Sequence, residues 1–130
     1  NMSWMSWVEN ILPMDGVTHG AIMGQDGSTW AASEGLTITQ DEVKQILSIL
    51  NGNVAASFTI SGEKYVTLRA QEGFVDAKKN GYVASIYKST QCIVFAMHLP
   101  TDDKDTGQNI GPKLNAAAEY LCRSLGGIGY

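Results

Sequence analysis

The sequence has few cysteines and no spacing that would pair them. Cys92 and Cys122 are the two that occur in 130 residues, and they do not form the C-x-x-C spacing of a metal knuckle. A small scaffold held by disulfides would need more cysteines than this. We therefore expect both residues to be reduced and to pack in a core. The apolar stretch around Cys92 should keep it an unreactive thiol.

Long hydrophobic runs and tracts of like charge are also missing. No apolar run reaches the roughly 18 residues that span a bilayer, and the first residues lack the basic start of a signal peptide. We therefore expect a cytoplasmic location. With 44% hydrophobic and 17% charged residues, the composition predicts one ordinary globular domain over residues 1–130. The net charge of -4 argues against broad nucleic-acid binding.

The motifs of common enzymes are absent. The sequence contains no G-x-S-x-G, no H-E-x-x-H, no Walker A loop and no G-x-G-x-x-G. His19 and His98 lie in strand-like segments without carboxylates at metal-ligand spacing. The acidic residues Asp102, Asp103 and Asp105 do not fit the pattern of a calcium loop, and we expect a solvated loop there. The protein is therefore predicted to be no enzyme, with no catalytic residue, no metal and no cofactor.

Apolar periodicity and turn signals predict the order of helices and strands. Helical spacing and capping signals predict helices over residues 4–12, 40–51 and 112–125. Alternation and hairpin turns predict seven strands, over residues 17–24, 28–33, 57–60, 63–70, 74–79, 82–88 and 91–98. The last strand is apolar on both faces, so it should be central and covered on both sides. The strand over 63–70 alternates and should show one face to solvent. The order predicts an α+β fold.

Aromatic residues occur at both ends of the chain. Trp4 and Trp7 lie one helical turn apart, Trp30 lies in the first hairpin, and Tyr120 lies on the last helix. Core packing is one explanation, and spacing alone favours it. A groove for a polyproline II peptide is the other, because such peptides pack their rings on aromatic faces and leave carbonyls free for indole N–H donors. Spacing does not decide whether the two chain ends meet.

Four segments of the chain resemble profilins, with amoeba and plant members nearest. They are SWMSWVENIL at 3–12, GQDGSTWAAS at 24–33, GEKYVTLRA at 62–70 and AEYL at 118–121. The resemblance runs in the same order from residue 3 to about residue 124. It implies a profilin-like fold, in which a central antiparallel sheet carries the N- and C-terminal helices on one face and a smaller helix on the other.

The resemblance implies that the terminal helices and the sheet form a polyproline groove. Trp4, Trp7, Trp30 and Tyr120 correspond to it by motif. Trp7 stands where many family members carry Tyr, which keeps a stacking face but replaces the hydroxyl with an indole N–H. The tail LGGIGY departs from the usual shorter ending, so Tyr130 is left outside this predicted set.

The resemblance also implies a second face, which binds monomeric actin. Six of the nine basic residues match or lie near this face, and they are Lys64, Arg69, Lys78, Lys79, Lys88 and Lys113. Ordinary solvated strand faces would explain the same pattern. Phosphatidylinositol bisphosphate would compete for these lysines, although Asp76 departs from the family pattern and weakens that expectation.

The implied function is a cytoskeletal one. The protein would bind actin monomers and proline-rich segments of actin nucleators such as formins, and so regulate actin polymerisation. The alternative is a longin- or roadblock-like adaptor of small GTPases, which shares a helix-flanked sheet. Such an adaptor has no need for clustered tryptophans. A tryptophan fluorescence change on adding polyproline would therefore separate the two hypotheses.

Overall fold

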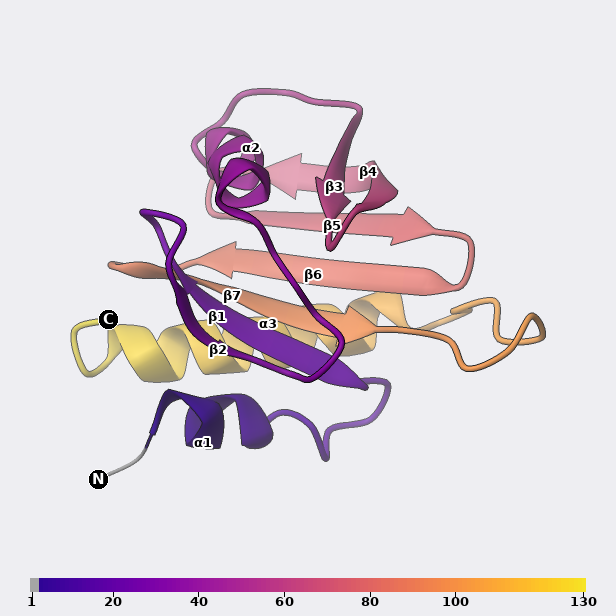
Figure 1. Cartoon of the computed structure of the whole chain (residues 1–130), viewed down its shortest axis with the longest axis horizontal. Helices are drawn as coiled ribbons and strands as arrows, with labels where there is room; N and C mark the ends of the chain where they lie inside the picture. Colours follow the sequence, from indigo (N-terminus) through magenta and orange to yellow (C-terminus); the bar gives the residue numbers. More distant parts are fainter. Residues whose placement is uncertain (1–2) are drawn as a thin grey trace.

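The computed structural model describes residues 3–130 and consists of a seven-stranded antiparallel sheet with helices on both faces (Figure 1). The sheet order is β2-β1-β7-β6-β5-β4-β3. Its strands are β1 (His19–Gly24), β2 (Thr29–Ala32), β3 (Ser57–Ile60), β4 (Glu63–Gln71), β5 (Phe74–Lys79), β6 (Tyr82–Lys88) and β7 (Cys92–His98). The predicted α+β class and all seven predicted strands are confirmed.

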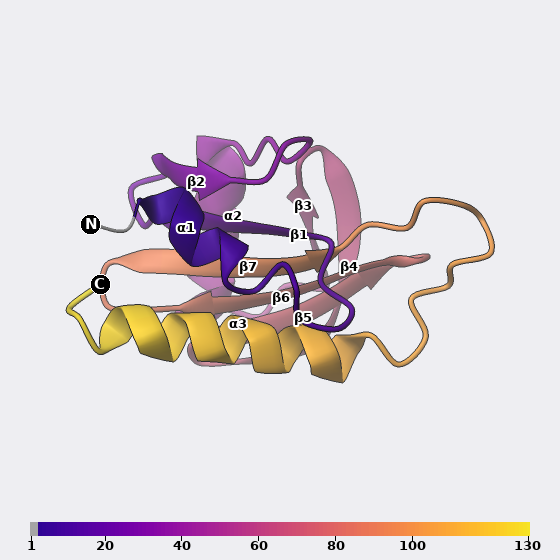
Figure 2. The ribbon, with the colours of Figure 1, turned by 90° about the horizontal axis from the view of Figure 1, so that it is seen from below.

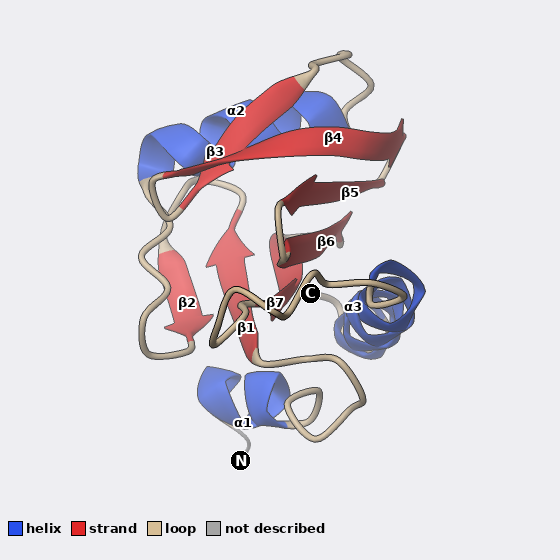
Figure 3. Cartoon of the chain, turned by 90° about the vertical axis from the view of Figure 1, so that its right-hand side faces the viewer, coloured by secondary structure: helices blue, strands red, loops and turns tan. Residues whose placement is uncertain are grey.

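The three helices divide between the two faces of the curled sheet (Figure 3). The two terminal helices, α1 (Trp4–Glu9) and α3 (Gly111–Gly126), share one core with the sheet, in which Val8 and Leu121 are fully buried. The helix α2 (Gln40–Leu50) packs on the other face, where Ile46 and Leu50 join a second core. The arrangement implied by the resemblance is therefore confirmed. No helix within residues 3–130 has both the length and the apolar character needed to cross a membrane.

The exposure of the strands also agrees with the sequence pattern. Every residue of β7 is buried, because helices cover this strand on both sides. In β4 the residue Tyr65 is buried, whereas Val66 and Leu68 on the opposite face are 54% and 60% exposed. The outer half of the sheet therefore shows one face to solvent beside α3.

Helix α1 is three residues shorter than its apolar spacing predicts. Ser3 caps it as expected, because its side chain accepts a hydrogen bond from the N–H of Ser6. The helix ends at Glu9, since Pro13 has no N–H to donate to the Glu9 carbonyl. Tighter turns follow, in which Ile11 N donates to Val8 O at 3.1 Å. Ile11 is still fully buried. Turns, and not a continued helix, therefore place this apolar side chain in the core.

A buried carboxylate at the start of α2 binds the turn between two strands of the sheet. The predicted capping box between Thr39 and Glu42 is present. Glu42 also accepts hydrogen bonds from the backbone N–H groups of Ser61 at 3.0 Å and Gly62 at 2.9 Å, in the turn between β3 and β4. Burial alone would raise the pKa of Glu42, but the N–H donors of Gly62, Thr39 and Ser61 outweigh it and leave the pKa lowered. The helix start is therefore held by a charged group.

Candidate functional site

The two ends of the chain meet at one end of the molecule. Figure 2 shows the start of α1 and the tail after α3 on the same side. The ring centroids of Trp4 and Trp30 are 4.5 Å apart, with their planes tilted by 37°. The ring of Tyr130 stands edge-on to both, at 4.9 Å from Trp4 and 6.0 Å from Trp30. Together with Trp7 these residues form what we call the aromatic shelf.

The shelf contains a hollow with free hydrogen-bond donors. Trp4, Trp7, Ile128 and Tyr130 line a cavity of about 370 Å³. None of the hydrogen bonds found among residues 3–130 uses the indole N–H of Trp4, Trp7 or Trp30. Each indole is only partly buried. The shelf can therefore offer both flat apolar faces and N–H donors to a ligand that carries unpaired carbonyl oxygens.

The tail reaches the shelf because glycines allow the chain to turn back after α3. Gly129 has a positive φ of 96°, and Tyr130 N donates to Leu125 O at 2.9 Å. Gln91, in the turn between β6 and β7, holds the tail from the other side. Its backbone N–H donates to Tyr130 O at 2.6 Å and its side-chain amide donates to Gly129 O at 2.9 Å. Sequence reasoning missed Tyr130, although the glycine-rich LGGIG segment was the available signal of a turn.

Tyr120 lies on α3 and does not line the hollow of the shelf. It is 52% exposed on α3, and it takes part in none of the aromatic pairs found in the described part of the chain. It lies about two helical turns after Lys113, whose ammonium pairs with Asp15 at 2.7 Å. Tyr120 is therefore on the side of α3 that faces the segment after α1. The predicted set of aromatics is only partly brought together.

The six predicted basic residues do not form one patch. Lys64 and Lys78 lie on the open face of the sheet beside α3, since Lys78 is directly opposite the exposed Val66. Arg69 lies on the same face, opposite Asp76. We call this surface the β4–β5 face.

The remaining basic residues point elsewhere. Lys79 forms an ion pair with Glu63. Glu63 is directly opposite Ile60 on the adjacent strand, and Ile60 belongs to the core under α2. Lys88 is opposite the buried Ile93 on the α2 side, and its Nζ donates to Asn51 Oδ1 at 2.7 Å. Lys113 lies in the first turn of α3. The structure therefore places Lys79 and Lys88 on the other face of the sheet.

The β4–β5 face combines apolar, charged and polar groups around a shallow cavity. A hollow of about 390 Å³ is lined by Leu68, Arg69, Asp76, Gly111, Pro112 and Asn115. Leu68 in this lining is exposed, and so is Val66 two residues before it on β4. Such a mixture of exposed aliphatic groups with arginine is typical of protein interfaces. Asn115 was not predicted from the sequence.

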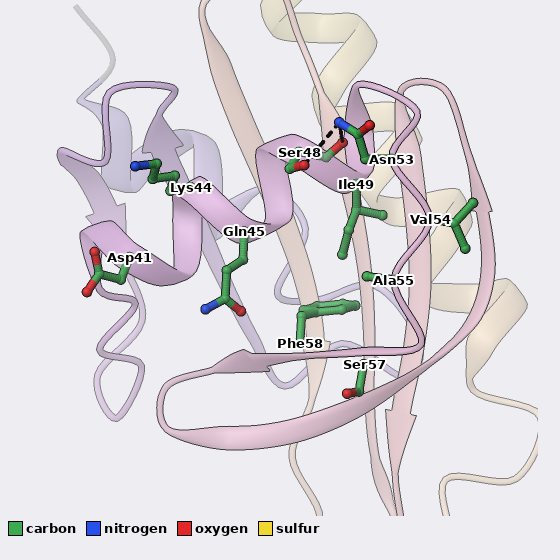
Figure 4. A pocket seen from close by; sticks show the side chains of 10 residues that line it. All are labelled: Asp41, Lys44, Gln45, Ser48, Ile49, Asn53, Val54, Ala55, Ser57 and Phe58. Carbon is green, nitrogen blue, oxygen red and sulfur yellow. Dashed lines mark hydrogen bonds between the residues drawn. The ribbon is translucent and has the colours of Figure 1, made fainter.

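A further cavity lies between α2 and β3, and it shares no lining residue with the hollows of the two surfaces (Figure 4). Its volume is about 480 Å³, and its walls include Lys44, Phe58 and the almost fully exposed Val54. The amide of Asn53 donates to Ser48 O at 3.2 Å and approaches Ser48 Oγ at 3.1 Å. These polar groups bind each other across one end of the cavity. Asp41 and Lys44 also line it.

The cysteines and His98 are engaged in the packing of the fold. Burial raises the pKa of Cys92 to about 12, and the nearby Cys122 adds to the rise, so Cys92 stays a thiol. His98 bridges Gly16 O, at 2.9 Å from Nδ1, and Asp105 Oδ2, at 2.7 Å from Nε2. Asp105 is thus not simply solvated as predicted. Within residues 3–130 no group of three His, Cys, Asp or Glu side chains could hold a metal ion.

Comparisons with known proteins agree with this geometry. The family model described as Profilin matches residues 2–125. Profilin-1A of Acanthamoeba castellanii is 32% identical over 124 residues, which cover 92% of this chain and 96% of that protein. The profilin of Drosophila melanogaster is 30% identical with the same coverage. The solved structure of A. castellanii profilin IB has a TM-score of 0.83 and 28% identity, and the match covers 98% of this chain and 100% of that chain.

Two more distant structures contain partners. Mouse profilin IIa in complex with a double repeat from the FH1 domain of mDia1 has a TM-score of 0.65 and 23% identity, with 95% of this chain and 99% of that chain covered. LokiProfilin2 in complex with rabbit actin has a TM-score of 0.74 and 16% identity, with 95% and 96% covered. At this identity the two structures show a shared fold.

Proposed function

The chain belongs to the profilin family, and we propose that it binds an actin monomer and a proline-rich peptide on two separate surfaces. Profilins with the same fold have been solved with rabbit actin and with an FH1 repeat. The protein would thereby bring actin monomers to nucleators such as formins and regulate polymerisation in the cytoplasmic cytoskeleton. In this proposal residues 1–130 act as one domain, without a catalytic step or a cofactor.

The aromatic shelf is the proposed polyproline site. The observation that supports it is the packing of Trp4, Trp30 and Tyr130 around a hollow that leaves the indole N–H groups unpaired within the described chain. A polyproline II helix has unpaired carbonyls and flat rings, so it would be bound by both features. Trp7 would line the same groove. Tyr120 would extend it along α3.

The β4–β5 face is the proposed actin site. Lys64, Arg69 and Lys78 share this face with exposed Val66 and Leu68. Positive charge there would steer association with an acidic partner, and the aliphatic groups would contribute area. Lys113 lies at the start of α3 and would border the face. Phosphatidylinositol bisphosphate would compete for Lys64 and Lys78 in this proposal.

A binding experiment with both ligands tests the proposal. Polyproline added to the free protein should change the intrinsic tryptophan fluorescence, and protein held on immobilised polyproline should then retain monomeric actin. An unchanged spectrum at millimolar peptide would contradict the shelf assignment. Retention of the protein but not of actin would contradict only the second surface.

A further inference from the structure

A closed ring of side-chain contacts lies at the centre of the β4–β5 face. Arg69 Nη2 donates to Asp76 Oδ2 at 3.1 Å. The guanidinium of Arg69 also lies over the ring of Phe74, at 4.9 Å from its centroid. One arginine from β4 is thus held by a charge and by an aromatic face, both from β5.

The ring of contacts closes through β6 and α3. Phe74 stacks on Tyr87 with centroids 5.1 Å apart and planes 14° apart. Tyr87 OH donates to Asn115 Oδ1 at 2.8 Å. Asn115 Nδ2 in turn donates to Asp76 Oδ1 at 3.1 Å, and it lies 3.3 Å from Oδ2. Each of the five side chains therefore contacts the next, and the last returns to the first.

Asp76 is the member of the ring that carries its negative charge. Its side chain is only 15% exposed, whereas that of Arg69 is 57% exposed. Besides Arg69 and Asn115, Ser85 Oγ donates to Asp76 Oδ1 at 2.7 Å. A carboxylate that is this far from water requires such donors. The contacts also fix the direction in which Arg69 can point.

The charges outside the ring are different. Among residues 3–130, neither Lys64 nor Lys78 has a carboxylate within ion-pair distance. The positive charge of Arg69 is cancelled by Asp76, so the net charge of the face comes from these two lysines.

We propose that Asp76 is a positioning residue for actin binding, which holds Arg69 and Asn115 in the hollow at the start of α3 and cancels the arginine charge. This inference rests on the proposed function of the β4–β5 face. In this proposal Lys64 and Lys78 attract actin over a distance by their charge. The ring provides side chains in fixed positions for direct contact with actin. A pre-arranged arginine loses less side-chain entropy on binding.

A double-mutant cycle on the actin complex tests the positioning role. The variants Asp76→Ala and Arg69→Gln should each speed dissociation of actin about tenfold. Because Asp76 acts through Arg69, the double variant should dissociate no faster than either single variant. Lys78→Gln is the matched control on the same face outside the ring, and its effect should multiply with that of Asp76→Ala. A double variant about a hundredfold faster than wild type would overturn the proposal.

The salt dependence of actin binding tests the cancellation of charge. Asp76→Asn exposes the charge of Arg69, so the affinity for actin should fall more steeply with added salt than that of the wild type. An unchanged salt dependence would refute the cancellation of charge.

In the free protein, Asp76→Ala and Asn115→Ala should each raise the unfolding equilibrium constant about tenfold, and together hardly more. Additive effects would show that the ring does not form, whether or not actin binds. If the wild-type protein does not bind actin, the proposed function itself is contradicted.

Discussion

The aromatic shelf and the β4–β5 face lie on one sheet but are built in opposite ways. The shelf combines residues from the two ends of the chain, and neither an ion pair nor a charged side chain occurs among Trp4, Trp7, Trp30 and Tyr130. The β4–β5 face comes from consecutive strands and has the Arg69–Asp76 pair at its centre. We therefore expect binding at the shelf to depend on ring area and to be insensitive to salt. Binding at the β4–β5 face should weaken as salt is added.

The supports of the two surfaces also differ. Backbone groups fix the shelf, because the tail that carries Tyr130 is held by main-chain bonds to Leu125 and Gln91. Side chains fix the β4–β5 face through the ring around Asp76. A single substitution can therefore remove one surface and leave the other in place. Substitutions at and away from the two surfaces test this contrast.

Replacing Trp4 should have the largest effect. The variant Trp4→Ala removes the ring that contacts both Trp30 and Tyr130. The affinity for polyproline should fall about 30-fold or more, which corresponds to ~2 kcal/mol, as for a central aromatic of an interface. Titration of the remaining tryptophan fluorescence with polyproline measures it. Actin affinity should hardly change, and an equal loss at both surfaces would indicate misfolding and break the contrast.

Replacing Lys78 should weaken actin binding alone. The variant Lys78→Glu reverses a charge on the β4–β5 face, so the actin affinity should fall about tenfold at low ionic strength. The loss should shrink as salt is added. Sedimentation or fluorescence binding of monomeric actin across a salt series measures it. Polyproline affinity should stay at the wild-type value.

Lys88→Glu is the matched control for Lys78→Glu. Both change a lysine on the sheet to glutamate, but Lys88 lies on the α2 side, where it bonds Asn51. It should leave actin affinity within about twofold of the wild type. An equal loss for both variants would show that the actin site reaches around the edge of the sheet. The proposal that the actin site is confined to the β4–β5 face would then be wrong.

Local sequence patterns predicted most of the fold, whereas the resemblance to profilins predicted most of the shelf. Hairpin turns and alternation gave the strands, since each of these signals acts over a few residues. Helical spacing placed Trp4 and Trp7 together, and the resemblance added Trp30. Tyr130 could not be predicted in the same way. Its position depends on a glycine turn and on contacts with Gln91, which is 39 positions away in the sequence.

The predicted basic residues included two that lie outside the β4–β5 face, Lys79 and Lys88. The resemblance grouped Lys78 with Lys79, but adjacent residues of a strand point to opposite faces. That alternation was available from the sequence and would have separated them. The ring was not available, because Asn115 on α3 meets Asp76 only after the helix has packed across β6 and β7. Contacts between distant elements require the folded structure.

A substitution that lowers stability and leaves both surfaces intact serves as a reference for the contrast. Glu42→Gln removes the charge that holds the start of α2, at a residue that lines neither the hollow of the shelf nor that of the β4–β5 face. At neutral pH the free energy of unfolding should fall by about 1–2 kcal/mol. Chemical denaturation measures it. Under conditions where the variant is folded, both affinities should equal those of the wild type.

The same variant has a predicted pH dependence. The native pKa of Glu42 lies below its ordinary value of 4.5, so the carboxylate stabilises the fold above that pH. This contribution is lost as the pH falls below 4.5 and through the native pKa. The stability gap between wild type and Glu42→Gln should therefore close in acid. A gap that stays constant to lower pH would mean that the charge of Glu42 is not what holds α2.

The smallest expected loss of affinity tests whether the side chain of Gln91 helps to hold the tail that carries Tyr130. Gln91→Ala removes the side-chain donor to Gly129 O but keeps the backbone bond to Tyr130. Polyproline affinity should fall about threefold, because one exposed hydrogen bond is worth roughly 0.5–1 kcal/mol. Gln25→Ala is the matched control, since Gln25 Nε2 donates to Ser89 O in the same turn without touching the tail. In a Tyr130→Ala background, Gln91→Ala should have no further effect. A threefold loss that persists there would show that Gln91 acts on the shelf by another route than the tail.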